Sequence, residues 1–195
     1  MRRDQLEHLI RAAGRILDTD EVVVIGSQAI LASVTTGLPV EATRSIEADI
    51  LPFDDPDEAK ADLIDGLLGE ASMFQETHGI YAQGVGQHTA RLPDGWQDRL
   101  VALSNENTNG VTGWCLEPHD LCVSKLLAGR PKDHEFCRAL IRAGIVEPVT
   151  LTDRLALTDA TPAETERSLA IIDSLGHGLE HGRQLPDDPD IGLGI

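Results

Sequence analysis

Aromatic side chains and cysteines are both scarce in this sequence. Aromatic residues make up 3% of the chain, which leaves few platforms on which the bases of single-stranded nucleic acid could stack. The three cysteines, Cys115, Cys122 and Cys137, are too few and too clustered for a disulfide framework. The N-terminus carries no charged and then apolar leader, and no long apolar run follows it. We therefore expect a soluble, cytoplasmic protein with no membrane partner.

Positive charge is also in short supply. The chain has 16 lysines and arginines against 33 aspartates and glutamates, a formal net charge of -17. Such a field repels polyanions, which argues against broad adhesion to DNA or to an anionic membrane, although a local basic patch could still meet one. A length of 195 residues with 41% hydrophobic content is ordinary for a globular chain. We expect one compact domain.

The hydrophobic pattern predicts an α/β (α+β) protein. Apolar residues recur at helical spacing between Arg3 and Leu17, and short β-branched runs bounded by turn residues predict strands. In a later helix, Asp55 is the predicted N-cap, Pro56 the first helical residue, and Glu58 closes a capping box. Helices are expected at residues 3–17, 28–34 and 56–68, and strands at 21–25, 45–51, 79–85, 89–92, 99–103 and 111–116.

The C-terminal third is predicted to be helical. One helix opens at Pro118 and stops at Gly129, and a second runs from Pro131 to Ala143. A capping box at residues 161–164 starts a third, which ends at about Leu175. The expected organisation is an α/β core at residues 1–116, a helical part at 117–176, and an acidic, flexible tail at 177–195.

Two short stretches carry the candidate chemistry. Glu47 and Asp49 lie two apart on a predicted strand, so their carboxylates project from one face and can share a hard divalent ion such as Mg²⁺. Gly26 and Ser27 follow the preceding strand, where a turn offers backbone N–H groups and a hydroxyl to a phosphate. Taken singly, the first pattern is usually a solvated strand edge and the second a common tight turn.

The order of these stretches resembles the DNA polymerase β-like nucleotidyltransferase superfamily, whose pattern is hG[GS] followed by [DE]h[DE]h. Here the two parts are IGS at residues 25–27 and EADI at 47–50. The RSIEAD run at 44–49 and the KLLAGRPKD run at 125–133 are similar to segments of the AbiEii-type branch of toxins. The resemblance covers roughly residues 22 to 140 and is closest to the DUF6036-like relatives.

The resemblance implies a minimal nucleotidyltransferase fold: a mixed, mostly antiparallel sheet flanked by helices, with a helical C-terminal part. It also implies a nucleoside triphosphate substrate, Mg²⁺ or Mn²⁺, and transfer of a nucleoside monophosphate to a hydroxyl on RNA, for instance tRNA, or on protein. A toxin role would add a cognate antitoxin as a partner.

The resemblance further assigns roles to nine residues. Glu47 and Asp49 would hold the metal, and Gly26 and Ser27 would receive phosphates. Four basic residues would bind or neutralise the nucleotide, with Lys132 the weaker candidate among them. Asp133 would orient the basic side chains or act as a base. The assigned catalytic residues are Glu47, Asp49, Lys125 and Asp133, and the nucleotide-binding residues are Gly26, Ser27, Arg44, Arg130 and Lys132.

Some features depart from that pattern and leave alternatives open. Glu47 stands where the branch usually has Asp, and a third carboxylate cannot be placed, with Glu76, Asp94 and Asp98 as the nearby options. A catalytically inactive module that binds a nucleotide or a partner protein is therefore the second hypothesis. The H-x-x-C pairs at 119–122 and 134–137 have a spacing that suits zinc, but cysteines on apolar helix faces are more often core.

Overall fold

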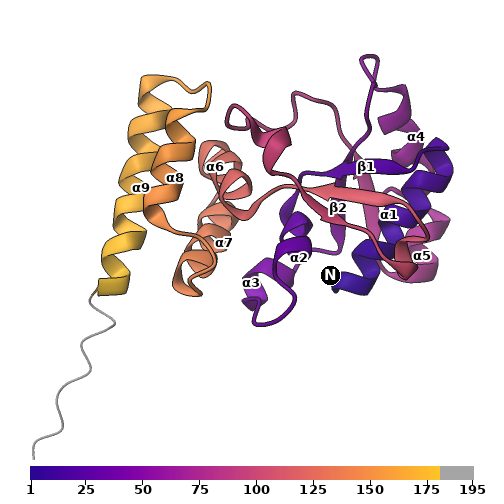
Figure 1. Cartoon of the computed structure of the whole chain (residues 1–195), viewed down its shortest axis with the longest axis horizontal. Helices are drawn as coiled ribbons and strands as arrows, with labels where there is room; N and C mark the ends of the chain where they lie inside the picture. The colour runs from indigo at the N-terminus through magenta and orange to yellow at the C-terminus, as the bar shows by residue number, and fades with distance from the viewer. Residues whose placement is uncertain (181–195) are drawn as a thin grey trace, which may run out of the picture.

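A five-stranded mixed sheet forms the centre of the structure, a computed structural model that describes residues 1–180 (Figure 1). The strand order is β3-β2-β1-β5-β4. β1 pairs antiparallel with β2 and parallel with β5, β2 pairs parallel with β3, and β4 pairs antiparallel with β5. The strands are β1 (Glu21–Val24), β2 (Glu47–Leu51), β3 (Tyr81–Gly84), β4 (Val101–Leu103) and β5 (Thr112–Cys115).

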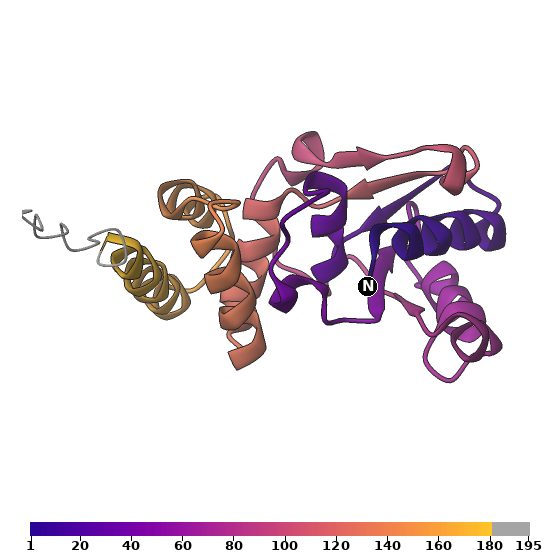
Figure 2. The same cartoon turned by 90° about the horizontal axis from the view of Figure 1, so that it is seen from below.

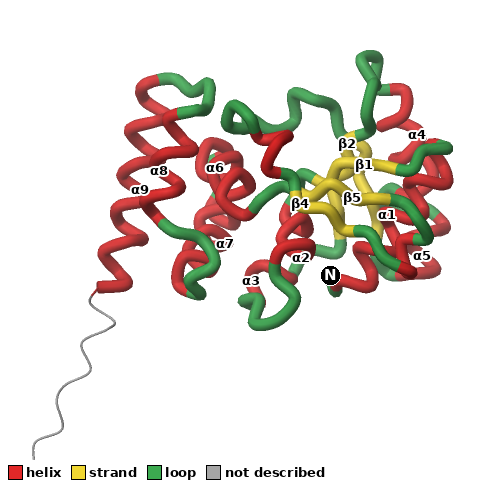
Figure 3. The backbone as a smooth tube through the Cα atoms, in the orientation of Figure 1, coloured by secondary structure: helices red, strands yellow, loops and turns green. Residues whose placement is uncertain are grey.

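Helices surround this sheet and continue beyond it. α1 packs along β1 and β5, and α4 lies beside α1 and covers β2 and β3 (Figure 2). The remaining helices follow the strands or form the C-terminal part (Figure 3). The helices are α1 (Arg3–Leu17), α2 (Ile30–Ser33), α3 (Val40–Thr43), α4 (Ala59–Leu68), α5 (Met73–His78), α6 (Pro118–Ala128), α7 (Pro131–Arg142), α8 (Pro148–Ala156) and α9 (Pro162–Glu180), with short 3-10 turns η1 (Ser27–Ala29), η2 (Trp96–Arg99) and η3 (Glu106–Thr108).

The sequence explains why β1 is the central strand. Val22, Val23 and Val24 are fully buried between β2 and β5, and β-branched residues suit a strand covered on both faces. One cluster of buried apolar side chains runs from α1 through the sheet into α6, α7, α8 and α9. The predicted mixed sheet, flanking helices and helical C-terminal part are confirmed. The strand pairings divide evenly into two parallel and two antiparallel, rather than mostly antiparallel.

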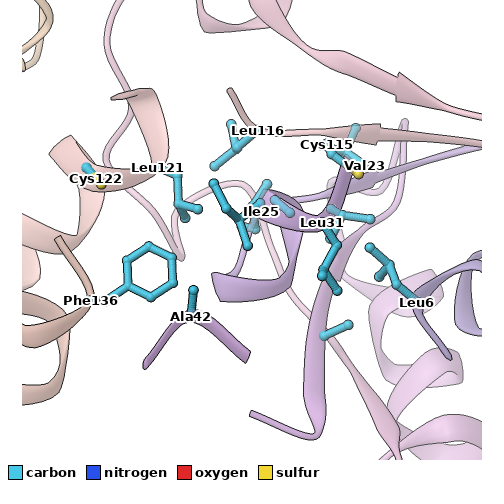
Figure 4. Packing of buried hydrophobic residues seen from close by; sticks show 14 of the residues in the cluster. Leu6, Val23, Ile25, Leu31, Ala42, Cys115, Leu116, Leu121, Cys122 and Phe136 are labelled. Atoms are coloured by element: carbon cyan, nitrogen blue, oxygen red, sulfur yellow. The ribbon is translucent and has the colours of Figure 1, made fainter. Parts of the chain in front are cut away.

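The helical part joins the sheet through apolar side chains at the α6–α7 hairpin. Figure 4 shows Leu121 of α6 and Phe136 of α7 close to Ile25, at the end of β1, and to Ala42 of α3. All four side chains are buried members of the same core cluster. The α6–α7 hairpin is therefore held against the end of β1 by hydrophobic burial, and it forms one wall of any cleft at that end of the sheet.

A buried carboxylate adds an ionic contact between these parts. Asp120 of α6 is completely buried, and Arg99 of η2 donates from Nε to Asp120 Oδ2 over 2.8 Å. Arg154 of α8 brings Nε within 3.4 Å of Asp120 Oδ1. One side chain thus links the segment before β4 to two helices of the C-terminal part.

Several details differ from the sequence prediction. The strand expected at 89–92 is wrong, since the Thr89 N–H donates to the Gly86 carbonyl in a turn, and Arg91 is bound by Glu164 at the start of α9. The capping box with Glu58 is also wrong. Glu58 has a left-handed φ of 58°, so α4 begins only at Ala59.

Asp55 is not the N-cap residue and Pro56 lies before the helix, so both of these predictions are wrong. The Asp55 carboxylate nevertheless accepts from the N–H groups of Lys60 (2.9 Å) and Ala61 (2.8 Å) in the first turn of α4. The capping box between Thr161 and Glu164 is confirmed. α9 continues to residue 180, past the predicted end at 175, and most of the predicted tail, residues 181–195, lies outside the described residues.

No helix within residues 1–180 has both the length and the apolar character that a membrane crossing requires.

We expect Asp120→Asn to destabilise the fold by about 2–3 kcal/mol, because it leaves two arginines without their shared counter-charge. This loss of stability is smaller than the loss usual for a fully buried ion pair, since both arginines keep some contact with water. Urea unfolding followed by circular dichroism measures it. Asp153→Asn, on the exposed side of α8, is the matched control and should leave the midpoint unchanged. Equal midpoints for the two variants would contradict the structural role of Asp120.

Candidate functional site

A cleft of about 670 Å³ lies where the β1 end meets the α6–α7 hairpin. Its size is in the range usual for small-molecule sites. All nine residues assigned from the sequence line it, although they come from four separate parts of the chain. These residues are Gly26, Ser27, Arg44, Glu47, Asp49, Lys125, Arg130, Lys132 and Asp133.

The acidic side of the cleft is built on β2. Glu47 and Asp49 alternate with the buried Ala48 and Ile50, so both carboxyl groups project to the cleft face. The Glu47 carboxyl group lies near enough to Asp49 to raise its pKa. The Tyr81 hydroxyl, on the neighbouring β3, donates to Glu47 Oε2 over 2.9 Å. Glu47 is thus fixed by β3 as well as by its own strand.

Gly26 makes room for Asp49. A Cβ added at Gly26 would lie 1.5 Å from Asp49 Oδ2, far inside van der Waals contact. Any other residue at this position would have to displace the carboxylate. The glycine before Ser27 is therefore required by the acidic pair, in addition to any part that the turn plays in receiving phosphate.

The acidic pair holds unfavourable negative charge. Burial raises the pKa of Asp49 to about 6, and the neighbouring Glu47 adds to the rise, while Lys125 and Arg130 oppose it. Burial, together with the hydrogen bond to Glu47, also raises the pKa of Tyr81 to about 12, so its hydroxyl stays protonated and remains a donor. A cation placed between the carboxylates would relieve the repulsion that the basic residues relieve only in part.

The basic side of the cleft is built on α6 and α7. Gly129, with a φ of 70°, ends α6 and lets the chain turn directly into α7. Lys125 Nζ lies 3.1 Å from Asp133 Oδ1, and Arg130 Nε lies 2.6 Å from Asp133 Oδ2. The Lys125 ammonium also lies 4.7 Å from the centre of the Phe136 ring. Asp133 therefore holds both cations in a fixed arrangement.

Asp133 is a weak base in this setting. Its burial favours the protonated form, but hydrogen bonds and charges from Arg130 and Lys125 outweigh that effect and keep its pKa below the usual value.

Arg44 and Lys132 are exposed at the rim, and Arg44 lies 3.8 Å from both Glu41 and Glu135.

The structure also shows cleft residues that the sequence did not indicate. Gln83 of β3 lines the cleft in register with Asp49, and Glu58 lines it from the turn before α4. The options considered for a third carboxylate, Glu76, Asp94 and Asp98, are not among the lining residues. Within residues 1–180, no group of three His, Cys, Asp or Glu side chains is placed to hold a metal ion.

The cysteine and histidine pattern belongs to the packing of the helices. Cys122 and Cys137 are fully buried, and Cys137 Sγ donates to the Cys122 carbonyl over 3.6 Å. Both ring nitrogens of His119 have partners, namely Glu117 Oε1 at 2.6 Å and the Glu147 N–H at 3.1 Å. The core interpretation of the cysteines is confirmed.

Comparison with known proteins places the chain in a family. The family profile described as "Nucleotidyltransferase of unknown function (DUF6036)" matches residues 4–164, so the chain belongs to this family. The matched range contains the whole cleft. Comparisons with curated proteins and with solved structures gave no match.

We expect Gly26→Ala to destabilise the protein by about 1–3 kcal/mol, because the added methyl group overlaps the Asp49 carboxylate. Gly66→Ala is the matched control. Gly66 lies in α4 with no atom near its would-be Cβ, so alanine there should stabilise the helix by up to about 1 kcal/mol. Urea unfolding of both variants tests the pair, and a Gly26→Ala protein as stable as the parent would contradict the close approach.

The Asp49 carboxyl predicts a pH-dependent stability in a metal-free buffer with EDTA. Between its ordinary pKa of 3.8 and its folded value of about 6, the folded chain keeps a proton that the unfolded chain has released. The free energy of unfolding therefore falls as pH rises through this window, and the full cost applies above pH 6.

Asp49→Asn removes this cost. We expect the variant to be more stable than the parent by about 2–3 kcal/mol at pH 7.5, with the difference shrinking toward zero as pH falls to 4. Urea midpoints at three pH values measure it. A difference that stays constant with pH, or a variant less stable at pH 7.5, would show that the carboxylate is not under strain.

Proposed function

We propose that this member of the DUF6036 family binds a nucleoside triphosphate in the cleft and transfers its nucleoside monophosphate to an acceptor hydroxyl. The observation that carries the proposal is the convergence of opposite charges. Glu47 and Asp49 on β2 share one 670 Å³ cleft with Lys125 and Arg130 from α6 and the start of α7. The Gly26–Ser27 turn lies at the same cleft.

The acidic pair fits a hard divalent cation. Its two carboxyl groups face the same cleft, and burial with repulsion from Glu47 raises the pKa of Asp49. Oxygen ligands of this kind are those that Mg²⁺ and Mn²⁺ prefer. Glu47 and Asp49 would hold the ion, which when bound supplies charge to polarise the phosphates and stabilise the leaving pyrophosphate.

The other residues act by position and charge. Lys125 and Arg130 stabilise negative charge that develops on the phosphates, from places fixed by Asp133. Ser27 and the backbone at Gly26 receive a phosphate group at the turn. Asp133 orients the two cations and does not act as a general base, because both of its oxygens accept from them and its pKa is lowered.

The acceptor in this proposal is a hydroxyl on RNA or on a protein. Arg44, Arg130 and Lys132 are exposed at the rim and form the local positive charge that an RNA end requires in a chain of net charge -17. The likeness of residues 44–49 and 125–133 to AbiEii-type toxins supports tRNA modification and growth arrest, countered by an antitoxin. Growth of a host that expresses the chain, with and without a candidate antitoxin encoded beside it, tests this part.

A second function is favoured by one observation. Gln83, a neutral amide, stands beside Asp49 on the adjacent strand, so Glu47 and Asp49 are the acidic side chains that β2 and β3 present to the cleft. A site with this low charge suits a module that binds a nucleotide without turning it over. Such a module would be stabilised by nucleotide yet leave no label on any macromolecule.

We expect each nucleoside triphosphate that binds to raise the melting temperature in the presence of Mg²⁺ or Mn²⁺, since the ligand binds only the folded chain. Incubation with α-³²P-labelled triphosphates and total RNA or cell protein should label an acceptor. Glu47→Gln and Asp49→Asn should lower the labelling at least about a hundredfold. Asp153→Asn on α8 should leave it unchanged.

The outcomes separate the two functions. Nucleotide stabilisation without label, in any RNA or protein fraction, would establish the binding module and reject the transferase. If no triphosphate stabilises the chain with either ion, and the Glu47→Gln and Asp49→Asn variants behave as the parent, neither function is correct.

A further inference from the structure

We infer that the cleft takes one divalent cation rather than two, and that Gln83 is the residue that sets this number. The inference rests on the proposed function, because it concerns the ion held by Glu47 and Asp49. It starts from the side-by-side pairing of β2 and β3, whose register decides which β3 side chains join the acidic pair.

The register places Gln83 at the acidic pair. β2 and β3 run parallel, with Glu47 opposite Tyr81 and Asp49 opposite Gln83. Residues paired across neighbouring strands project from the same face of a sheet. The Tyr81–Glu47 hydrogen bond of 2.9 Å confirms the shared face for the first pair, and Gln83 lines the same cleft as Asp49.

A carboxylate at position 83 would therefore be the third acid of the cluster. The residue present is an amide, which offers one neutral oxygen and no charge. Two divalent ions bring four positive charges, and two carboxylates balance only half of them. The other acids at the cleft do not join this pair. Glu41 and Glu135 lie near Arg44, and Asp133 binds Lys125 and Arg130. Glu58 also lines the cleft, but within the described residues no third acid groups with Glu47 and Asp49.

Tyr81 reduces the ligand supply further. Its hydroxyl donates to Glu47 Oε2, so one of the two oxygens of that carboxylate is already engaged. The bond takes one lone pair of Oε2 and makes that oxygen a weaker ligand for a second ion.

Side chains supply part of the charge that a second ion would bring. Lys125 and Arg130 line the same cleft as Asp49, and both are held by the buried Asp133. One divalent ion, these two cations and the Asp133 carboxylate together carry a net charge of +3, against +4 for a pair of ions. The phosphates of a bound nucleotide are neutralised from two sides, by the ion at β2 and by the side chains at α6 and α7.

The number of ions can be read by electron paramagnetic resonance with Mn²⁺ and the non-cleavable analogue α,β-methylene ATP. Two Mn²⁺ ions about 4 Å apart, as in two-metal sites, couple to each other and change the six-line spectrum of an isolated ion. We expect the parent protein to show isolated Mn²⁺ only, with one ion lost per chain in Asp49→Asn.

Gln83→Asp should convert the one-ion site into a two-ion site. The new carboxylate joins the cluster, and we expect a second bound Mn²⁺ per chain with the spectrum of a coupled pair. Gln83→Asn is the matched control, similar in size to aspartate but neutral, and it should keep the isolated spectrum. Circular dichroism of each variant shows whether the fold is kept.

Three results would overturn the inference. A coupled pair in the parent protein would do so while leaving the proposed function intact. A folded Gln83→Asp protein with a single isolated ion would show that position 83 does not set the number. If instead the Asp49→Asn protein binds as much Mn²⁺ as the parent, the proposed function is rejected, and the inference falls with it.

Discussion

The repulsion between Glu47 and Asp49 is the constraint on which the rest of the cleft depends. A strand that places two carboxyl groups on one face loses stability through their repulsion. Several other residues of the chain accommodate or offset that repulsion. Gly26 lacks a side chain where Asp49 needs space, and Tyr81 holds one oxygen of Glu47 from the next strand. Lys125 and Arg130 supply opposing charge from the far wall. Each of these is local chemistry that a divalent ion would complete.

Buried aspartates organise the helical part in the same manner at two places. Asp133 binds Lys125 and Arg130 at the cleft, and Asp120, which does not line the cleft, binds Arg99 and Arg154. In both cases a single carboxylate with almost no exposure gathers two basic side chains from different segments. The first arrangement orients charge toward the cleft, while the second fixes α6 and α8 relative to the sheet.

Local patterns in the sequence predicted much of this structure. Alternation along residues 47–50 and the spacing from Lys125 to Asp133 are short-range signals, and both put their side chains where expected. The close approach of Gly26 to Asp49 and the pairing of Gln83 with Asp49 depend on strand register, which short-range patterns do not specify. The strand expected at 89–92 failed for a related reason, since Arg91 binds Glu164, 73 residues later. Long-range contacts override local propensity there.

The apolar contact of Leu121 and Phe136 with Ile25 and Ala42 has a thermodynamic consequence for the cleft (Figure 4). Its two walls belong to one cooperative unit, so widening the cleft would expose core side chains to water. The shape of the cavity is therefore set before a ligand arrives, and little conformational entropy remains to be lost on binding. Amide protons of β1, β2 and α6 should consequently exchange together, at the rate of global unfolding, instead of through a separate opening of the cleft.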